Sequence, residues 1–139
     1  MPENHTNMDL CRYRLAKSEE YLADAKLLFE HGSIKSSNNR AYYSIFHALR
    51  AVLAIDGVEF KKHSGNIQYF LREHVKTGHF DAACSDIVLS ASRIRNASDY
   101  DDFYVASKSE TEIQVKDAEK FLITVRDYIS KNLPENQSS

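Results

Sequence analysis

The sequence contains no tryptophan, only four glycines and only two cysteines, and its two prolines lie near the ends, at Pro2 and Pro134. Because there is no internal proline, nothing interrupts long helices between these positions. Cys11 and Cys84 stand alone, without the paired spacing of a disulfide framework, a zinc site or a redox motif. We therefore expect free, largely buried thiols, no metal site and no cofactor.

Long hydrophobic runs are also absent. The most apolar stretch, residues 48–55, is interrupted by Arg50 and is too short to span a bilayer, and the polar residues 1–8 lack the apolar centre of a signal peptide. We expect a cytoplasmic protein that does not bind membranes. The 139 residues, with a net charge of −2, suit one domain with a single core. The basic excess between residues 34 and 80 is either a solvated face or a weak signal for a polyanionic partner.

Apolar residues recur at helical spacing in several segments, and no segment alternates with the period of two that marks a strand. Gly57 suits a left-handed C-cap and Asp81 an N-cap. The last helix begins with a capping box, either Ser107 with Glu110 or the pair two residues later, Ser109 with Glu112. The predicted helices span residues 9–30, 38–55, 64 to about 75 and 81 to about 98, and a last one runs from residue 107 or 109 to a point before Pro134.

These segments predict an all-α fold, an antiparallel up-and-down four-helix bundle with one additional short helix. We expect a flexible N-terminus over residues 1–8, the bundle over residues 9–131 and a disordered tail over residues 132–139. The second helix is apolar over much of its surface. It must therefore contact the bundle core and, in addition, either another helix or a second protomer.

Two segments, residues 40–48 and 93–100, place polar groups inside these apolar patterns, where burial is costly without a partner. Arg95 offers a planar fork suited to phosphate oxygens, and Tyr100 follows it after four residues. A phenol with a pKa of about 10 is a poor base at pH 7. Arg95 is therefore an ion-pair partner for the acidic residues 99, 101 and 102, a phosphate ligand, or part of a nuclease.

The other candidates each have a packing alternative. His47 is either a substitute base or a buried, hydrogen-bonded histidine, and Tyr43 either stacks on a base or packs in the core. His63, before a helix start, either holds an anion or belongs to a simple cap. The candidate catalytic residues are Arg95, Tyr100 and His47, and the candidate nucleotide- or RNA-binding residues are Arg40, Tyr43, Lys62, His63 and Asn96.

Four groups of residues together carry a resemblance to a known family: Arg40-Ala41-Tyr42-Tyr43 with Phe46-His47-Ala48, Lys62-His63-Ser64-Gly65, Val75-Lys76-Thr77-Gly78, and Asp99-Tyr100 with Phe103. From about residue 13 to residue 129 the chain resembles the HEPN domain family (higher eukaryotes and prokaryotes nucleotide-binding), in its small stand-alone prokaryotic branch. The resemblance implies a homodimer. In many members an Arg and a His a few residues later form a metal-independent ribonuclease site across the dimer.

Arg95 and Asn96 match the family's Arg and the polar residue that often follows it, but Tyr100 stands where the His is expected. Ribonuclease activity is therefore the alternative rather than the main prediction. The resemblance implies a nucleotide- or RNA-associated module that acts with a minimal nucleotidyltransferase in a toxin–antitoxin type pair, with Tyr100 or Tyr104 as hypothetical acceptors of modification. A second alternative is a non-catalytic nucleotide-binding or scaffolding bundle.

Overall fold

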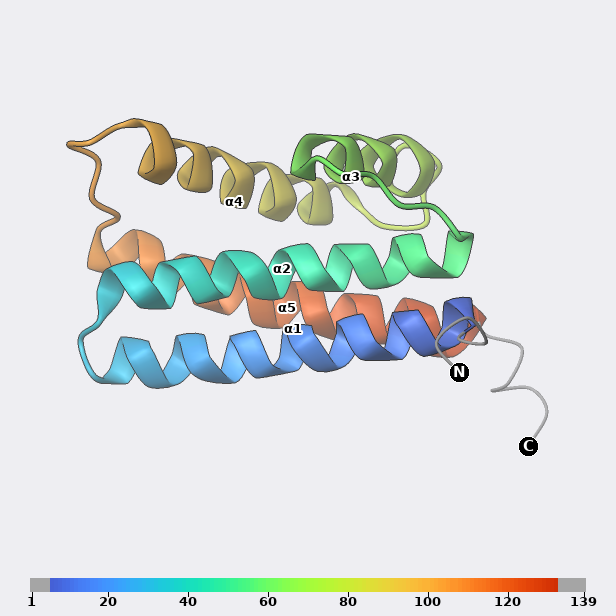
Figure 1. Cartoon of the computed structure of the whole chain (residues 1–139), viewed down its shortest axis with the longest axis horizontal. Coiled ribbons are helices and arrows are strands. Elements are labelled where there is room, and N and C mark those ends of the chain that lie inside the picture. Colours follow the sequence, from blue (N-terminus) through green and yellow to red (C-terminus); the bar gives the residue numbers. More distant parts are fainter. Residues whose placement is uncertain (1–5, 133–139) are drawn as a thin grey trace.

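A computed structural model describes residues 6–132, and consecutive long helices in it run in alternating directions (Figure 1). No strand occurs among these residues, so the predicted all-α bundle with one additional short element is confirmed. Most of the two predicted flexible ends lies outside the described residues. The elements are α1 (Asn7–Glu30), α2 (Ile34–Asp56), α3 (His63–Phe70), the π-helical turn η2 (Leu71–Val75), α4 (Ala82–Tyr100) and α5 (Lys108–Asn132).

Three helices begin earlier than predicted, α3 by a single residue. Helix α1 starts two residues sooner because the Thr6 hydroxyl accepts the Asp9 N–H and the Asp9 carboxylate accepts the Thr6 N–H, each over 3.1 Å. Helix α2 starts at Ile34, although its first turn reads as a polar loop in sequence. Ser37 is buried there because its hydroxyl donates to the Ala25 carbonyl over 2.7 Å.

The caps predicted at Gly57, Asp81 and Ser107 are present. Gly57 ends α2 with φ of 73°, in the left-handed region. The Asp81 carboxylate accepts the Cys84 N–H over 3.3 Å and begins α4. Ser107 and Glu110 exchange side chain-to-backbone hydrogen bonds of 3.0 Å and 3.0 Å, so the first of the two capping boxes considered is the one that forms.

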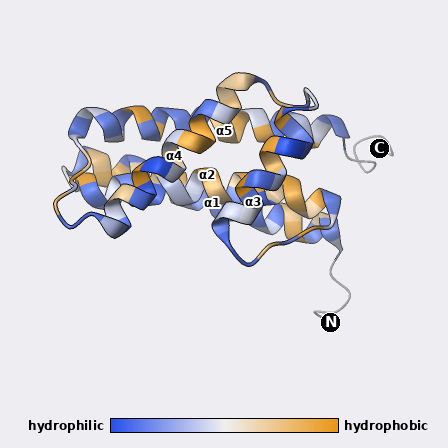
Figure 2. Ribbon diagram, turned by 90° about the horizontal axis from the view of Figure 1, so that it is seen from above, coloured by the Kyte–Doolittle hydropathy of each residue, from blue (hydrophilic) through white to orange (hydrophobic). Residues whose placement is uncertain are grey.

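Helix α2 is the central element, since it contacts α1, α3, α4 and α5. Each labelled helix carries both apolar and polar segments, as Figure 2 shows. The wide apolar band of α2 is covered by elements of the same chain, so this band alone does not require a second protomer. No helix within residues 6–132 is long and apolar enough to cross a membrane. The largest fully buried side chains are Phe70, Phe121, Leu49, Leu53 and Leu122.

Candidate functional site

Arg95 lies where α4 faces α2 and the start of α3, and its side chain is 29% exposed. Its neighbour Ile94 is buried and fixes this face of α4 against the bundle. The Arg95 guanidinium carbon lies 5.2 Å from the Tyr42 ring centroid and 5.9 Å from the Tyr43 ring centroid. Its Nη1 lies 3.1 Å from Nδ1 of His63. The structure thus brings together residues from the two sequence segments and from the third helix.

His63 opens α3 and is held by aromatic contacts. Its ring stacks on Phe46 with centroids 4.0 Å apart, and its Nδ1 lies 2.8 Å from the Tyr42 hydroxyl. A guanidinium has only donors, so Nδ1 of His63 must accept from Arg95 and carry no proton. Burial first, and then the charges of Arg95 and Arg50, lower the pKa of His63, in agreement with this assignment. His63 is therefore neutral at pH 7.

Tyr42 acts as a hydrogen-bond donor in this cluster. Burial raises the pKa of Tyr42 to about 12, although the Arg95 charge opposes the change. The phenol keeps its proton at neutral pH and directs it at His63. Tyr42, His63 and Arg95 form what we call the Arg95 cluster, in which two donors converge on one imidazole nitrogen.

A cavity of about 400 Å³ opens beside the Arg95 cluster. Its cations, Lys35 and Arg95, are matched in number by two carboxylates, Asp99 and Asp102. Arg95 Nε lies 3.6 Å from Asp99 Oδ2, a contact between two partly exposed groups that contributes little to stability. The guanidinium is thus available to another anion. The remaining lining residues are Asn38, Asn39, Tyr42, Ser98, Tyr104, Val105 and Ala106.

Helix geometry separates Tyr100 from Arg95. At about 100° per residue, Tyr100 lies about 140° around the α4 axis from Arg95, whereas Asp99 lies only about 40° away. Tyr100 is 85% exposed and does not line the cavity. Asn96 is also exposed and outside the cavity. The imidazole beside Arg95 is that of His63, which comes from another helix.

The remaining candidates lie at different places. His47 stacks on Tyr21 with centroids 5.3 Å apart, and burial lowers its pKa to about 4, so it is a weak base. Arg40 bonds to Asn39 over 2.7 Å and, with Tyr43, lines a second, polar cavity of about 420 Å³. Lys62 is exposed at the N-cap of α3. Within residues 6–132, no group of three or more His, Cys, Asp or Glu side chains is placed to hold a metal ion.

Sequence reasoning missed the pairing of His63 with Arg95 and the fact that Lys35, Asn38 and Tyr104 line the cavity beside it. Asn38 is the polar first residue of the predicted second helix, and in the structure it is buried and donates to the Thr111 hydroxyl over 3.0 Å. The only available signal was the position of His63 after two lysines and at a helix start, which marked it as an anion-binding candidate but not as a neighbour of Arg95.

Comparison with known proteins shows what this chain is similar to over most of its length. A family model described as HEPN domain matches residues 11–128. A UPF0332 protein of Archaeoglobus fulgidus is 34% identical over 125 residues, covering 90% of this chain and 99% of the relative. A UPF0332 protein of Thermotoga maritima is 31% identical over 120 residues, covering 86% and 91%.

A third relative is the Methanocaldococcus jannaschii protein named Putative toxin MJ0605, which is 33% identical over 118 residues and covers 85% of this chain and 84% of the relative. In all three cases the similarity extends over the helical bundle instead of being confined to one motif. The resemblance noted from the sequence is confirmed, and the chain belongs to the HEPN domain family.

Proposed function

We propose that this HEPN protein is a nucleotide- or RNA-binding module of a toxin–antitoxin type pair in the cytoplasm, and that it binds a phosphate group at Arg95. The observation that carries this proposal is the Arg95 guanidinium, which is only loosely paired with Asp99 and lies beside a 400 Å³ cavity. The toxin-like role is supported by the name of the relative from Methanocaldococcus jannaschii.

A phosphate suits this position for two reasons. Its oxygens accept the parallel N–H donors of a guanidinium, and these charge-assisted bonds are stronger than the 3.6 Å contact with Asp99. When a phosphate draws Arg95 away from His63, the Tyr42 hydroxyl can turn from donor to acceptor, so that Nδ1 of the imidazole can take up a proton and form a second cationic contact. Phosphate binding thus changes the Arg95 cluster from a state in which its polar groups hydrogen-bond to one another into a state in which they bind an anion.

The charge of the cavity favours a short ligand over a long polyanion. Two cations and two carboxylates line it, so it lacks the basic stripe with which a protein follows many phosphates. Its volume is in the range of small-molecule sites. The cavity therefore fits one phosphate and the adjacent nucleoside, from a free nucleotide or from the end of an RNA strand.

Binding of a nucleoside monophosphate and of a short single-stranded RNA, measured by calorimetry, tests this proposal. Arg95→Ala should weaken binding at least tenfold, because a charge-assisted pair is lost. Arg93→Ala is the matched control, since Arg93 is exposed on the same helix and does not line the cavity. Equal affinities for the two variants, or no binding by the wild-type protein, would refute the phosphate site.

A metal-independent ribonuclease is the second candidate, and one observation favours it. Although Tyr100 replaces the expected His along α4, His63 places an imidazole 3.1 Å from Arg95. A base for the ribose 2′-hydroxyl and a cation for the phosphate are the two groups this chemistry needs, and Nδ1 of His63 becomes the base once the substrate phosphate draws Arg95 away from it. RNA cleavage in EDTA should then be lost in His63→Gln and in Arg95→Ala but kept in Arg93→Ala. Intact RNA after incubation with the wild-type protein would exclude this activity.

The homodimer and the nucleotidyltransferase partner belong to the same proposal and have their own tests. Light scattering after gel filtration gives the mass of the purified chain, and a monomer at micromolar concentration would contradict the dimer. Co-expression with a minimal nucleotidyltransferase encoded beside this gene should yield one complex. Separate elution of the two proteins would contradict the partnership and leave the phosphate site unaffected.

A further inference from the structure

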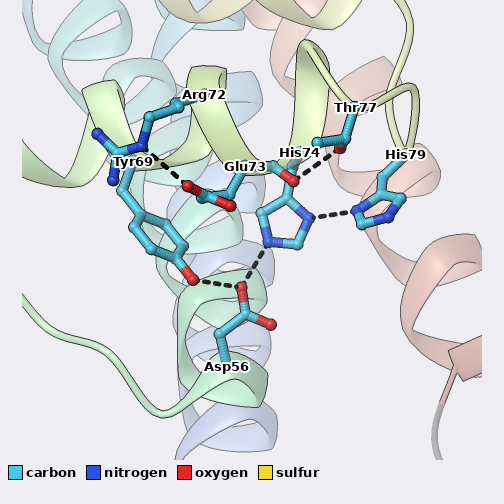
Figure 3. A network of polar contacts seen from close by, with 7 residues as sticks. All are labelled: Asp56, Tyr69, Arg72, Glu73, His74, Thr77 and His79. Atoms are coloured by element: carbon cyan, nitrogen blue, oxygen red, sulfur yellow. Dashed lines mark hydrogen bonds and ion pairs between the residues drawn. The ribbon is translucent and has the colours of Figure 1, made fainter.

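A second polar cluster lies at the other end of α2, where Asp56 ends the helix (Figure 3). Between Asn38, which lines the Arg95 cavity, and Asp56, α2 rises by about 27 Å. Asp56 Oδ2 accepts from the Tyr69 hydroxyl over 3.0 Å and lies 2.6 Å from Nε2 of His74. Nδ1 of His74 lies 3.1 Å from Nδ1 of His79. The proposed function uses none of these residues.

The π-helical turn η2 places His74 in this cluster. The Lys76 N–H donates to the Leu71 carbonyl over 2.9 Å, five residues back, and this wider turn carries His74 toward α2. His74 is 2% exposed, with the Phe70, Phe80 and Tyr128 rings within contact distance. A buried imidazole needs a partner for both nitrogens, and here both have one.

The positions of the hydrogens follow from the partners. The Asp56 carboxylate only accepts, so Nε2 of His74 carries a proton. When His74 is neutral, its Nδ1 is an acceptor and the facing Nδ1 of His79 is the donor. In that state Nε2 of His79 carries a lone pair. His79 is exposed and lines a cavity of about 310 Å³.

We propose that Nε2 of His79 is a phosphoryl-accepting nucleophile, with His74 and Asp56 as positioning residues that take up the proton released. Nε2 attacks the phosphorus of an acyl phosphate, the N–P bond forms, and the P–O bond to the acyl group breaks so that a carboxylate leaves. The Nδ1 proton of His79 moves to Nδ1 of His74, and the resulting imidazolium is neutralised by Asp56.

The surroundings of His79 favour a phosphoryl group over an uncharged acyl group. Lys131 lines the same cavity, and its exposed ammonium lies 3.0 Å from Asp127 Oδ2. An exposed lysine paired with an exposed carboxylate exchanges partners at little cost. Asp127 also lines this cavity, so Lys131 is its one cation beside one carboxylate among the described residues. Lys131 can turn to the oxygens of a phosphoryl group, whereas an uncharged acyl group would gain nothing from its charge.

The test incubates the full chain with acetyl phosphate and follows the intact mass, with peptide mapping under conditions that preserve phosphohistidine. We expect one acid-labile phosphoryl group per chain, on His79, and none on His79→Gln. His31→Gln is the matched control, since His31 is an exposed imidazole at the end of α1, and it should label at the wild-type rate. Acetylation of His79, equal labelling of His31 and His79, or no labelling would overturn the proposal.

Asp56→Asn separates the relay from simple exposure. The asparagine oxygen still accepts from Tyr69 and His74, so the fold should persist by circular dichroism, but the negative charge that neutralises the His74 imidazolium is gone. Labelling of His79 should slow at least tenfold. An unchanged rate would overturn the role of the relay, and so would nitrogen-15 NMR showing Nε2 of His79 protonated in the unmodified protein. Arg95→Ala leaves the His79 site intact. A failure of the phosphohistidine proposal can therefore be told apart from a failure of the proposed phosphate site at Arg95.

Discussion

Mild acid should destabilise this protein through His47. The residue lies in the middle of α2, its ring stacked on Tyr21, and its Nδ1 is buried without a hydrogen-bond partner among residues 6–132. Burial first, and then neighbouring positive charge, lowers the pKa of His47 from 6.5 to about 4. The neighbours responsible are Arg50, Arg14, Lys17 and His63.

The size of the effect follows from these two values. The unfolded chain takes up the His47 proton near pH 6.5, whereas the folded chain takes it up only near pH 4, so between them the unfolded state binds more protons. The stability contributed by neutral His47 is fully present above pH 6.5 and is lost as the pH falls toward 4. Between pH 7 and pH 5 the loss in the free energy of unfolding is about 2 kcal/mol.

Urea unfolding of the wild-type protein and of His47→Phe at pH 7, 6 and 5 measures this loss. Phenylalanine keeps a flat ring against Tyr21 and cannot titrate, and the contributions of all other groups cancel in the difference. The wild-type protein should lose about 2 kcal/mol more than the variant over this range. His31→Gln, at an exposed position, should follow the wild-type curve. Parallel curves for the wild-type protein and His47→Phe would refute the reasoning.

Two further predictions concern stability and thiol chemistry. Ser107→Ala removes the hydroxyl that accepts the Glu110 N–H, so it should lower the free energy of unfolding by about 1 kcal/mol, measured by urea titration. An unchanged midpoint of urea unfolding would show that this cap contributes nothing. Burial raises the pKa of both Cys11 and Cys84 to about 11. Iodoacetamide at pH 8 should therefore leave both thiols of the native protein unmodified and should alkylate both in urea. Rapid labelling of the native protein would contradict their burial.

The architecture could be predicted because it depends on local signals. Period-3.6 apolar residues fix the helices, and Gly57, Asp81 and Ser107 fix three of their ends through contacts with residues close in sequence. The first turn of α2, residues 34–37, was missed because Ser37 finds its partner, the Ala25 carbonyl, on α1 and not within its own helix. Polar residues favour a loop locally, and tertiary hydrogen bonds outweigh that preference.

The candidate site was only partly predictable for the same reason. Arg95, Tyr43 and His63 stand out in the sequence because each is polar or amphipathic within an apolar pattern. Their assembly depends on where α3 packs relative to α2 and α4, which no local pattern encodes. Counting along α4 from Arg95 leads to Tyr100, which the helix turns away, whereas the nearby imidazole comes from a residue 32 positions earlier.

The placement of polar groups along α2 explains why both candidate sites lie near its ends. Other helices cover its middle on several sides, so a polar group there must find a partner inside the bundle or remain unsatisfied. Ser44 succeeds because its small hydroxyl donates to the Ser18 carbonyl on α1 over 2.9 Å. His47 is larger, and its Nδ1 has no hydrogen-bond partner within the part of the chain that the structure describes. Burial and nearby cations lower its pKa to about 4, so it stays neutral at pH 7. At Tyr42, in the N-terminal half of α2, and at Asp56, its last residue, side chains of α3 and η2 pair with side chains of α2, and a cavity lies beside each of the two clusters.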